Sequence, residues 1–251
     1  MRADNRLDLA TPPAPVPGQP AGGPYEYDWV GNRVHPPSGA NPMVYNNADQ
    51  LVKWLGMHGD ATHAGYLYDG AGNLTTVKNV SGSTTLASYT YASAGLLDTA
   101  TYKDKSGTTR TLSNTWDAES NRVAFNANGM EHDLVYDPTA DIPAVLEEST
   151  SSSTIYYIGE PGGSLIARLH PTGGIRYYHF DELGSTRLLT DGSGNVTDKY
   201  AYDAYGSLLS HECYSGSVNQ SYQYVGQLGY YTHWMEPDFG LLPDPPRSFS
   251  E

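Results

Sequence analysis

The sequence predicts an all-β fold, in which repeated β-hairpins lie side by side in a strip of curved antiparallel sheet. Three observations predict it: a surplus of tyrosine, an aromatic anchor that recurs along the chain, and a turn signal after most anchors. The chain has 21 tyrosines but only 4 phenylalanines among its 251 residues. Tyrosine suits strands with one half-buried face, because its ring packs while its hydroxyl reaches a partner or water. The predicted core is therefore thin.

An aromatic residue followed by a polar residue and a turn recurs through the chain. The units are YDWVGNRV (27–34), YNNADQLV (45–52), YDGAGNLT (68–75), YASAGLLD (91–98), WDAESNRV (116–123), YDPTADIP (136–143) and YDAYGSLL (202–209). The anchors, spaced 18 to 25 residues apart, are Tyr27, Tyr45, Tyr68, Tyr91, Trp116, Tyr136, Tyr157, Tyr178, Tyr202 and Tyr224. Such a period is typical of stacked supersecondary units.

Each unit predicts a strand, a turn and the start of a return strand. The aspartate after the aromatic can bond its own backbone two residues on, and Gly31, Gly72 and Gly95 suit the positive φ that closes the turn. About twenty residues hold two short strands and two turns. The best helical candidate is the short stretch 46–59.

The two ends of the chain differ in composition from the repeats. Residues 1–24 contain six prolines and predict an extended, poorly ordered leader, and residues 243–251 form a second proline-rich tail. No continuous apolar stretch of a signal peptide or of a membrane-spanning helix is present. The degenerate repeats begin at residue 25.

Charge and cysteine content exclude several classes of function. The formal net charge of −14, with only 14 lysines and arginines, argues against nucleic acid and against an anionic membrane surface. The single cysteine, Cys213, excludes an internal disulfide framework.

The repeat units resemble the YD repeats of bacterial Rhs proteins and their relatives, which include insecticidal toxin-complex shells and animal teneurins. The stretches YYHFDELGSTRLLTDGSGNVTDKYAYDAYG (177–206) and YQYVGQLGYY (222–231) closely resemble the Rhs repeat-associated core region. The resemblance assigns degenerate YD repeats to residues 25–153 and a core-like region to residues 154–242. The core-motif residues are His179, Asp181, Gly184, Ser185, Arg187, Asp191, Gly194, Asp203, Gly206, Gly226 and Gln227.

The resemblance implies a β-sheet strip that spirals into a hollow shell around a C-terminal toxin, which an aspartyl autoprotease releases. The DPxG motif of that autoprotease occurs nowhere in the chain, and after EPDFGLL (236–242) the sequence turns to PDPPRSFSE. The expectation is a shell protein truncated before the autoprotease and toxin parts, without peptide-cleaving activity.

Enzyme-like and metal-like clusters are few, and a structural role is expected for each. His179, Asp181 and Ser185 have the residue types of a nucleophilic triad, but neighbours on a strand alternate faces. The stretch HGDATH (58–63) has the wrong histidine spacing for one helix or strand face. DGSGNV (191–196) lacks the glycine and glutamate of a calcium loop and predicts a hairpin turn. Cys213 lies near His211. Two interpretations are open for Cys213, a reactive thiol and an ordinary small residue, and the second is favoured. No cofactor and no metal are expected.

The predicted function is a non-enzymatic shell or scaffold that encloses or displays a protein cargo. The alternative is a module that binds carbohydrate or a cell surface through exposed tyrosines. A hydrolase that uses the region of His179 is the third hypothesis. The resemblance implies a secreted or cell-surface location, and open sheet edges predict self-association.

Overall fold

The computed structural model describes residues 26–35, 43–54, 63–79, 81–103, 107–137, 144–161, 164–202, 206 and 208–232. The predicted leader and tail lie outside these residues, as does Asp203. Two compact units are distinguished, residues 1–95 with 100–109 and residues 96–99 with 110–251.

The described chain is almost entirely β, which confirms the predicted fold class. The strands are β1 (Glu26–Tyr27), β2 (Arg33–His35), β3 (Val44–Tyr45), β4 (Leu51–Lys53), β5 (His63–Tyr68), β6 (Leu74–Asn79), β7 (Thr85–Tyr91), β8 (Leu97–Lys103), β9 (Thr109–Trp116), β10 (Arg122–Ala127), β11 (Met130–Asp137), β12 (Ala144–Ser149), β13 (Thr154–Gly159), β14 (Leu165–His170), β15 (Gly174–Phe180), β16 (Thr186–Asp191), β17 (Val196–Tyr202) and β18 (Leu208–Cys213). Two short 3₁₀ turns complete the secondary structure, η2 (Ser93–Gly95) and η3 (Gly226–Leu228).

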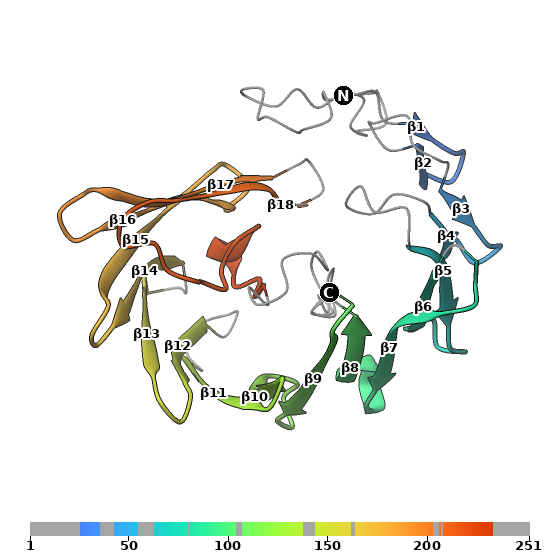
Figure 1. Cartoon of the computed structure of the whole chain (residues 1–251), viewed down its shortest axis with the longest axis horizontal. Coiled ribbons are helices and arrows are strands. Elements are labelled where there is room, and N and C mark those ends of the chain that lie inside the picture. Colours follow the sequence, from blue (N-terminus) through green and yellow to red (C-terminus); the bar gives the residue numbers. More distant parts are fainter. Residues whose placement is uncertain are drawn as a thin grey trace. The chain divides into compact units, whose positions relative to one another are not determined.

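Strands β5 to β18 form one 14-stranded sheet in strict chain order, with β5 and β18 at its edges (Figure 1). Neighbouring strands such as β10 and β11, or β17 and β18, are antiparallel, as expected for consecutive hairpins. Strands β1 and β2 form a separate hairpin, and so do β3 and β4. Strands β12 and β13 pair across the turn at residues 150–153, so the sheet continues through the boundary at 153/154 between the degenerate repeats and the core-like region.

The described part of 46–59 contradicts the helical candidate. Residues 46–50 form a turn and Leu51–Lys53 form β4. The Asn46 side chain accepts the N–H groups of Ala48 and Gln50, at 2.9 and 3.0 Å. This local bonding competes with a helix and opens a hairpin instead.

A register shift lies near the C-terminal end of many odd-numbered strands, just before a tyrosine, Phe180 or Gly159. The shifts lie at 26/27, 44/45, 67/68, 135/136, 158/159, 179/180 and 201/202. A bulge bends its strand and increases the local twist. Within the second unit, the shift recurs at the same position of β11, β13, β15 and β17 and bends these strands.

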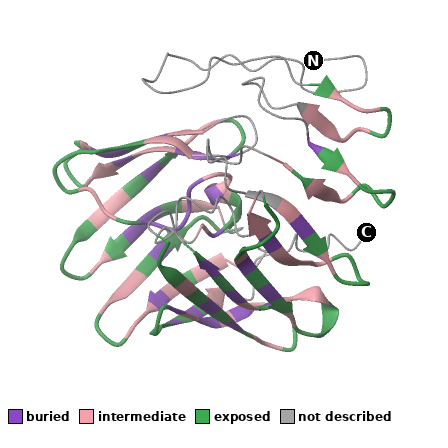
Figure 2. Cartoon of the chain, turned by 45° about the vertical axis from the view of Figure 1, so that its right-hand side comes forward, coloured by how far each residue is buried: buried purple, intermediate pink, exposed green. Residues whose placement is uncertain are grey.

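Side chains alternate between a buried face and an open face along most strands (Figure 2). The buried positions two residues before the bulged end are Met43, Tyr66, Tyr89, Asn114, Leu134, Tyr157, Tyr178 and Tyr200. We call this side of the sheet the tyrosine face. In the second unit, residues 214–232 follow β18 and lie against this face, where Figure 1 shows them inside the bend of β11 to β17. We call residues 214–232 the covering segment.

Candidate functional site

The turns that follow the odd-numbered strands β5 to β17 share one rim of the sheet, and the turns after β1 and β3 take the same position in their separate hairpins. The residues just before these turns form a ladder, and we call them rim residues. These rim residues are Tyr27, Tyr45, Tyr68, Tyr91, Trp116, Tyr136, Gly159, Phe180 and Tyr202. Five of these aromatics form the same kind of hydrogen bond. The tyrosine hydroxyl or tryptophan N–H donates to a main-chain carbonyl, and that carbonyl belongs to the residue six positions after the preceding rim residue. The bonds are Tyr45 to Arg33 at 2.9 Å, Tyr68 to Leu51 at 2.8 Å, Tyr91 to Leu74 at 2.8 Å, Trp116 Nε1 to Leu97 at 2.9 Å and Tyr136 to Arg122 at 2.9 Å. The repeat is therefore joined to its neighbour by one recurring side-chain bond.

The aspartate after the rim residue folds the turn, as the sequence predicts. In the turn between β5 and β6, Asp69 Oδ1 accepts the N–H groups of Ala71 and Asn73, each at 2.9 Å. Asn73 Nδ2 also donates to the second carboxylate oxygen at 3.0 Å. The bond from the Asn73 side chain, followed by the backbone bonds, lowers the pKa of Asp69 below its ordinary value. The same arrangement recurs at Asp28, Asp117 and Asp191.

Three of the predicted anchors do not lie at the rim. Tyr157 and Tyr178 lie on the tyrosine face, two residues before the rim residues Gly159 and Phe180. Tyr224 lies on no strand, because the chain leaves the sheet after Cys213. Val225 follows with a φ of 52°, and the two residues precede η3.

The covering segment is fixed to the sheet by main-chain bonds. Thr186 donates its N–H to the carbonyl of Gln223 at 2.8 Å and its hydroxyl to the carbonyl of Tyr222 at 2.6 Å. The Arg168 guanidinium donates to the carbonyl of Asn219. Because these bonds satisfy buried main-chain groups, they hold an irregular segment in one position.

A buried carboxylate on β12 connects the sheet to the end of the covering segment. Glu148 is 4% exposed and lies 2.9 Å from His132 Nδ1. It accepts the hydroxyls of Tyr157 and Tyr231, each at 3.0 Å. Burial raises the pKa of Glu148, but the bond and charge of His132, with the two tyrosine bonds, hold that pKa below its usual value. Nothing in the local sequence distinguishes Glu148 from Glu147, and this network was not predicted.

Two distant parts of the core motif come together at the rim. Gly184 accepts the N–H of Gln227 at 3.0 Å, and Ser185 Oγ accepts the N–H of Val225 at 3.0 Å. Gly226 begins η3 beside Tyr222, whose Cβ is 2.9 Å from the position of an added Cβ. These residues hold the covering segment against the β15–β16 turn.

The remaining core-motif residues serve other local contacts. His179 is exposed on the open face and lies 3.0 Å from the Thr190 hydroxyl. Asp181 accepts the N–H of Ser185 at 2.9 Å, and Arg187 lies 3.9 Å from the Asp181 carboxylate. Asp191 and Gly194 form the hairpin turn on the opposite rim. Within the described residues, His179, Asp181 and Ser185 therefore do not converge as a nucleophilic triad. The stretch 58–62 and the side chain of His63 lie outside the described residues.

We expect Gly206→Ala to lower the free energy of unfolding by about 2–4 kcal/mol. Gly206 has a φ of +88°, and an added Cβ would lie 2.5 Å from Cδ1 of Tyr224. Gly194→Ala is the matched control, because Gly194 has a φ of +84° with nothing within 4 Å of the added Cβ. Gly194→Ala should lower the free energy of unfolding only by the cost of backbone strain, about 1–2 kcal/mol. Chemical denaturation measures both values, and equal losses would contradict a packed Gly206–Tyr224 contact.

A small pocket lies beside the covering segment, near the rim. Its lining includes Val145, Tyr157, Gly159, Tyr222 and Gln227. Its volume of about 80 Å³ is far below the few hundred cubic ångströms of an ordinary small-molecule site. Among the described residues, no helix has the length and apolarity needed to cross a bilayer.

Three known proteins are similar to this chain over part of their own length. The tRNA3(Ser)-specific nuclease WapA of Bacillus spizizenii is 30% identical over 248 residues, which covers 80% of this chain and 10% of that protein. The chain therefore spans about a tenth of the length of this relative. The crystal structure of TcdB2-TccC3 is 15% identical with a TM-score of 0.42, covering 87% of this chain and 16% of that chain. The Photorhabdus luminescens Tc holotoxin pore is also 15% identical, with a TM-score of 0.38, covering 89% of this chain and 16% of that chain.

A family model also matches the chain. The model of the teneurin YD-shell matches residues 16–241, which include every strand of the sheet and the covering segment. The chain belongs to the teneurin YD-shell family.

Proposed function

We propose that this chain is a non-enzymatic segment of a shell wall in an Rhs-type toxin system, which encloses or displays a protein partner. The observation that carries the proposal is the rim ladder. One bond type, from a rim aromatic to the carbonyl six positions beyond the preceding rim residue, joins hairpin to hairpin. A wall built in this way can be lengthened by adding hairpins, and each addition brings its own bond.

Family membership and composition support this proposal. A shell has a large surface and little solid core, which suits tyrosines that bury a ring and bond a hydroxyl. The relative WapA is named as a nuclease of tRNA3(Ser), whereas this chain has a net charge of −14, which is unsuited to holding a polyanion. We place any catalytic function with a partner rather than with these repeats.

The proposed partner is a protein cargo, and the proposed location is secreted or at the cell surface. The acidic balance of the chain favours a cargo with a basic surface. The edge strands β5 and β18 would pair with further strands of a longer wall or with a second chain.

A passenger experiment tests the wall function. A small basic protein is fused after Glu251 through a linker with a specific protease site, and the rate of linker cleavage is measured. We expect slower cleavage than for the same passenger fused to an unrelated protein of similar size. Equal rates in the two fusions would contradict enclosure. Intact-mass measurement of the pure chain over time separately tests the non-enzymatic assignment, since a self-generated fragment would refute it.

One observation favours carbohydrate binding as a second candidate function. Tyr156 on β13 and Tyr177 on β15 are 42% and 40% exposed on the open face, where aromatic rings can stack on sugars. A glycan array should then show saturable binding that Tyr156→Ala and Tyr177→Ala abolish. Tyr230→Ala is the control, because Tyr230 is 43% exposed in the covering segment. Absence of binding by the unaltered chain would remove this candidate.

A further inference from the structure

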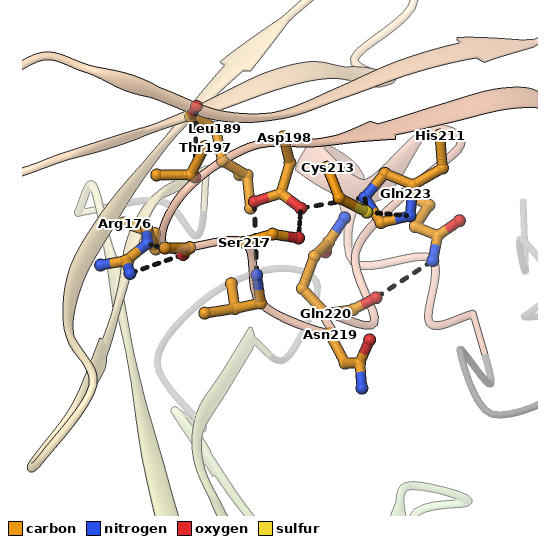
Figure 3. A network of polar contacts seen from close by, with 12 residues as sticks. Arg176, Leu189, Thr197, Asp198, His211, Cys213, Ser217, Asn219, Gln220 and Gln223 are labelled. Carbon is orange, nitrogen blue, oxygen red and sulfur yellow. Dashed lines mark hydrogen bonds and ion pairs between the residues drawn. The ribbon is translucent and has the colours of Figure 1, made fainter.

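Three residues able to bind a metal converge on the last hairpin of the sheet. Asp198 on β17 and Cys213 on β18 are directly opposite each other in the register, and His211 lies two residues before Cys213 on the same face. His211 Nε2 lies 2.9 Å from Asp198 Oδ1 and 3.6 Å from Cys213 Sγ. All three groups lie within 4.8 Å of one another, and Figure 3 shows them directed toward one point.

The carboxylate of Asp198 is a buried anion. Its side chain is fully buried, and among the described residues no lysine or arginine forms an ion pair with it. The carboxylate accepts a hydrogen bond from Ser217 and lies 2.9 Å from His211 Nε2. A buried charge of this kind is usually paired or bound to a metal.

The other two groups are held near this carboxylate and remain accessible. The His211 ring stacks on Tyr200, with ring centroids 4.3 Å apart and an angle of 15° between the planes. Cys213 is exposed on the edge strand, so an ion can reach the cluster from solvent. Ser217 donates its hydroxyl to Asp198 Oδ1 at 2.6 Å and helps to orient the carboxylate.

This set of donors matches the preferences of zinc. Thiolate, imidazole and carboxylate bind Zn²⁺ at about 2.0–2.3 Å, so neighbouring ligand atoms of a tetrahedral site lie about 3.3–3.6 Å apart. His211 Nε2 lies 2.9 Å from Asp198 Oδ1 and 3.6 Å from Cys213 Sγ, and all three ligand atoms lie within 4.8 Å of one another. Side-chain movements of about 1 Å would bring the three atoms to the separations of a tetrahedral site. Magnesium and calcium prefer all-oxygen sites, which a thiolate and an imidazole do not provide.

We propose that Asp198, His211 and Cys213 bind one Zn²⁺, with the fourth position occupied by water. On binding, the Cys213 thiol loses its proton to solvent, and the His211 imidazole keeps its single proton on Nδ1 while Nε2 binds the metal. The ion neutralises the buried carboxylate and ties the edge strand β18 to β17. The sequence alone did not predict this site, since no metal was expected from it.

Metal titration of the full reduced chain tests the proposal. Zinc content after dialysis is measured by elemental analysis, and Co²⁺ is used as a spectroscopic probe. We expect one tightly bound zinc per chain and a Co²⁺ spectrum with a thiolate-to-metal charge-transfer band and tetrahedral intensities. Cys213→Ser should abolish the band and weaken zinc binding by more than about tenfold, and Asp198→Asn should weaken it as well.

His179→Ala is the matched control, because His179 is an exposed histidine of the same sheet outside the cluster. It should bind zinc like the unaltered chain. Cys213 is exposed, so Cys213→Ser should keep the fold, and circular dichroism verifies this even if Asp198→Asn fails to fold. Equal zinc affinity in the unaltered chain and in Cys213→Ser, or a Co²⁺ spectrum without the thiolate band, would overturn the proposal.

Discussion

Replacing Glu148 by alanine is expected to lower the free energy of unfolding by about 3–5 kcal/mol, the usual cost of breaking a buried ion pair. The carboxylate is the common partner of His132, Tyr157 and Tyr231. Its removal leaves three buried polar groups without that partner, and each such group costs about 1–3 kcal/mol when unsatisfied. Urea denaturation followed by circular dichroism measures the loss.

Glu147→Ala is the matched control, because Glu147 is the preceding residue and lies opposite Tyr156 of the open face. We expect it to change stability by less than about 0.5 kcal/mol. The stability of Glu148→Gln should lie between those of Glu148→Ala and Glu147→Ala. An amide oxygen can still accept a tyrosine hydroxyl, but it lacks the negative charge that faces His132. A stability of Glu148→Ala equal to that of Glu147→Ala would show that the network contributes nothing to the fold.

The fold was predictable because the information for each hairpin is local. A rim aromatic, an aspartate and an asparagine four residues later specify the turn, as at Asp69 and Asn73. The turn also tolerates variation, since Ser120 takes the positive φ at the position that glycine occupies elsewhere. Repetition of such a local unit leaves few alternatives to a sheet in chain order.

The spacing marks Tyr157 and Tyr178 as repeat anchors but does not say on which face of the sheet they lie, because adjacent aromatics share the same pattern. Each belongs to a tyrosine pair, and the period alone cannot decide which side chain faces the sheet interior. The structure assigns the rim to Gly159 and Phe180, which lack the hydroxyl that the ladder uses. Tyr157 instead donates to Glu148.

The covering segment and its contacts were not predictable from the repeat. Tyr224 continues the spacing, but the chain has already left the sheet at Cys213. Tyr231 reaches Glu148 across 83 residues, and Val225 reaches Ser185 across 40. Such pairs depend on the final register and are not encoded in any local pattern. The Asp198–His211–Cys213 cluster was also not predicted, because only the register of β17 and β18 brings Asp198 opposite Cys213.

Alkaline solution is expected to unfold the protein steeply just above the ordinary pKa of tyrosine. Burial raises the pKa of Tyr66 to about 12 and raises the pKa values of Tyr89, Tyr157, Tyr178, Tyr200, Tyr202, Tyr222 and Tyr231 further. Above about pH 10 the unfolded chain releases these protons while the folded chain retains them. Stability therefore falls as pH rises, by about 1.4 kcal/mol per pH unit for each such tyrosine. A few of them together cancel the roughly 5–15 kcal/mol of an ordinary domain within about two pH units.

The measurement follows tyrosinate absorbance and far-ultraviolet circular dichroism through the same alkaline titration. We expect ionisation of the buried tyrosines to coincide with loss of the β signal, whereas the chain in concentrated urea should ionise without a cooperative step. Tyr178→Phe sharpens the test, because the buried Tyr178 hydroxyl has no hydrogen-bond partner among the described residues and its removal costs little stability at neutral pH. This variant should move the alkaline midpoint upward, since one group that resists ionisation is gone. Full ionisation of all tyrosines near pH 10 with an intact β signal would mean that the tyrosine face is open to water.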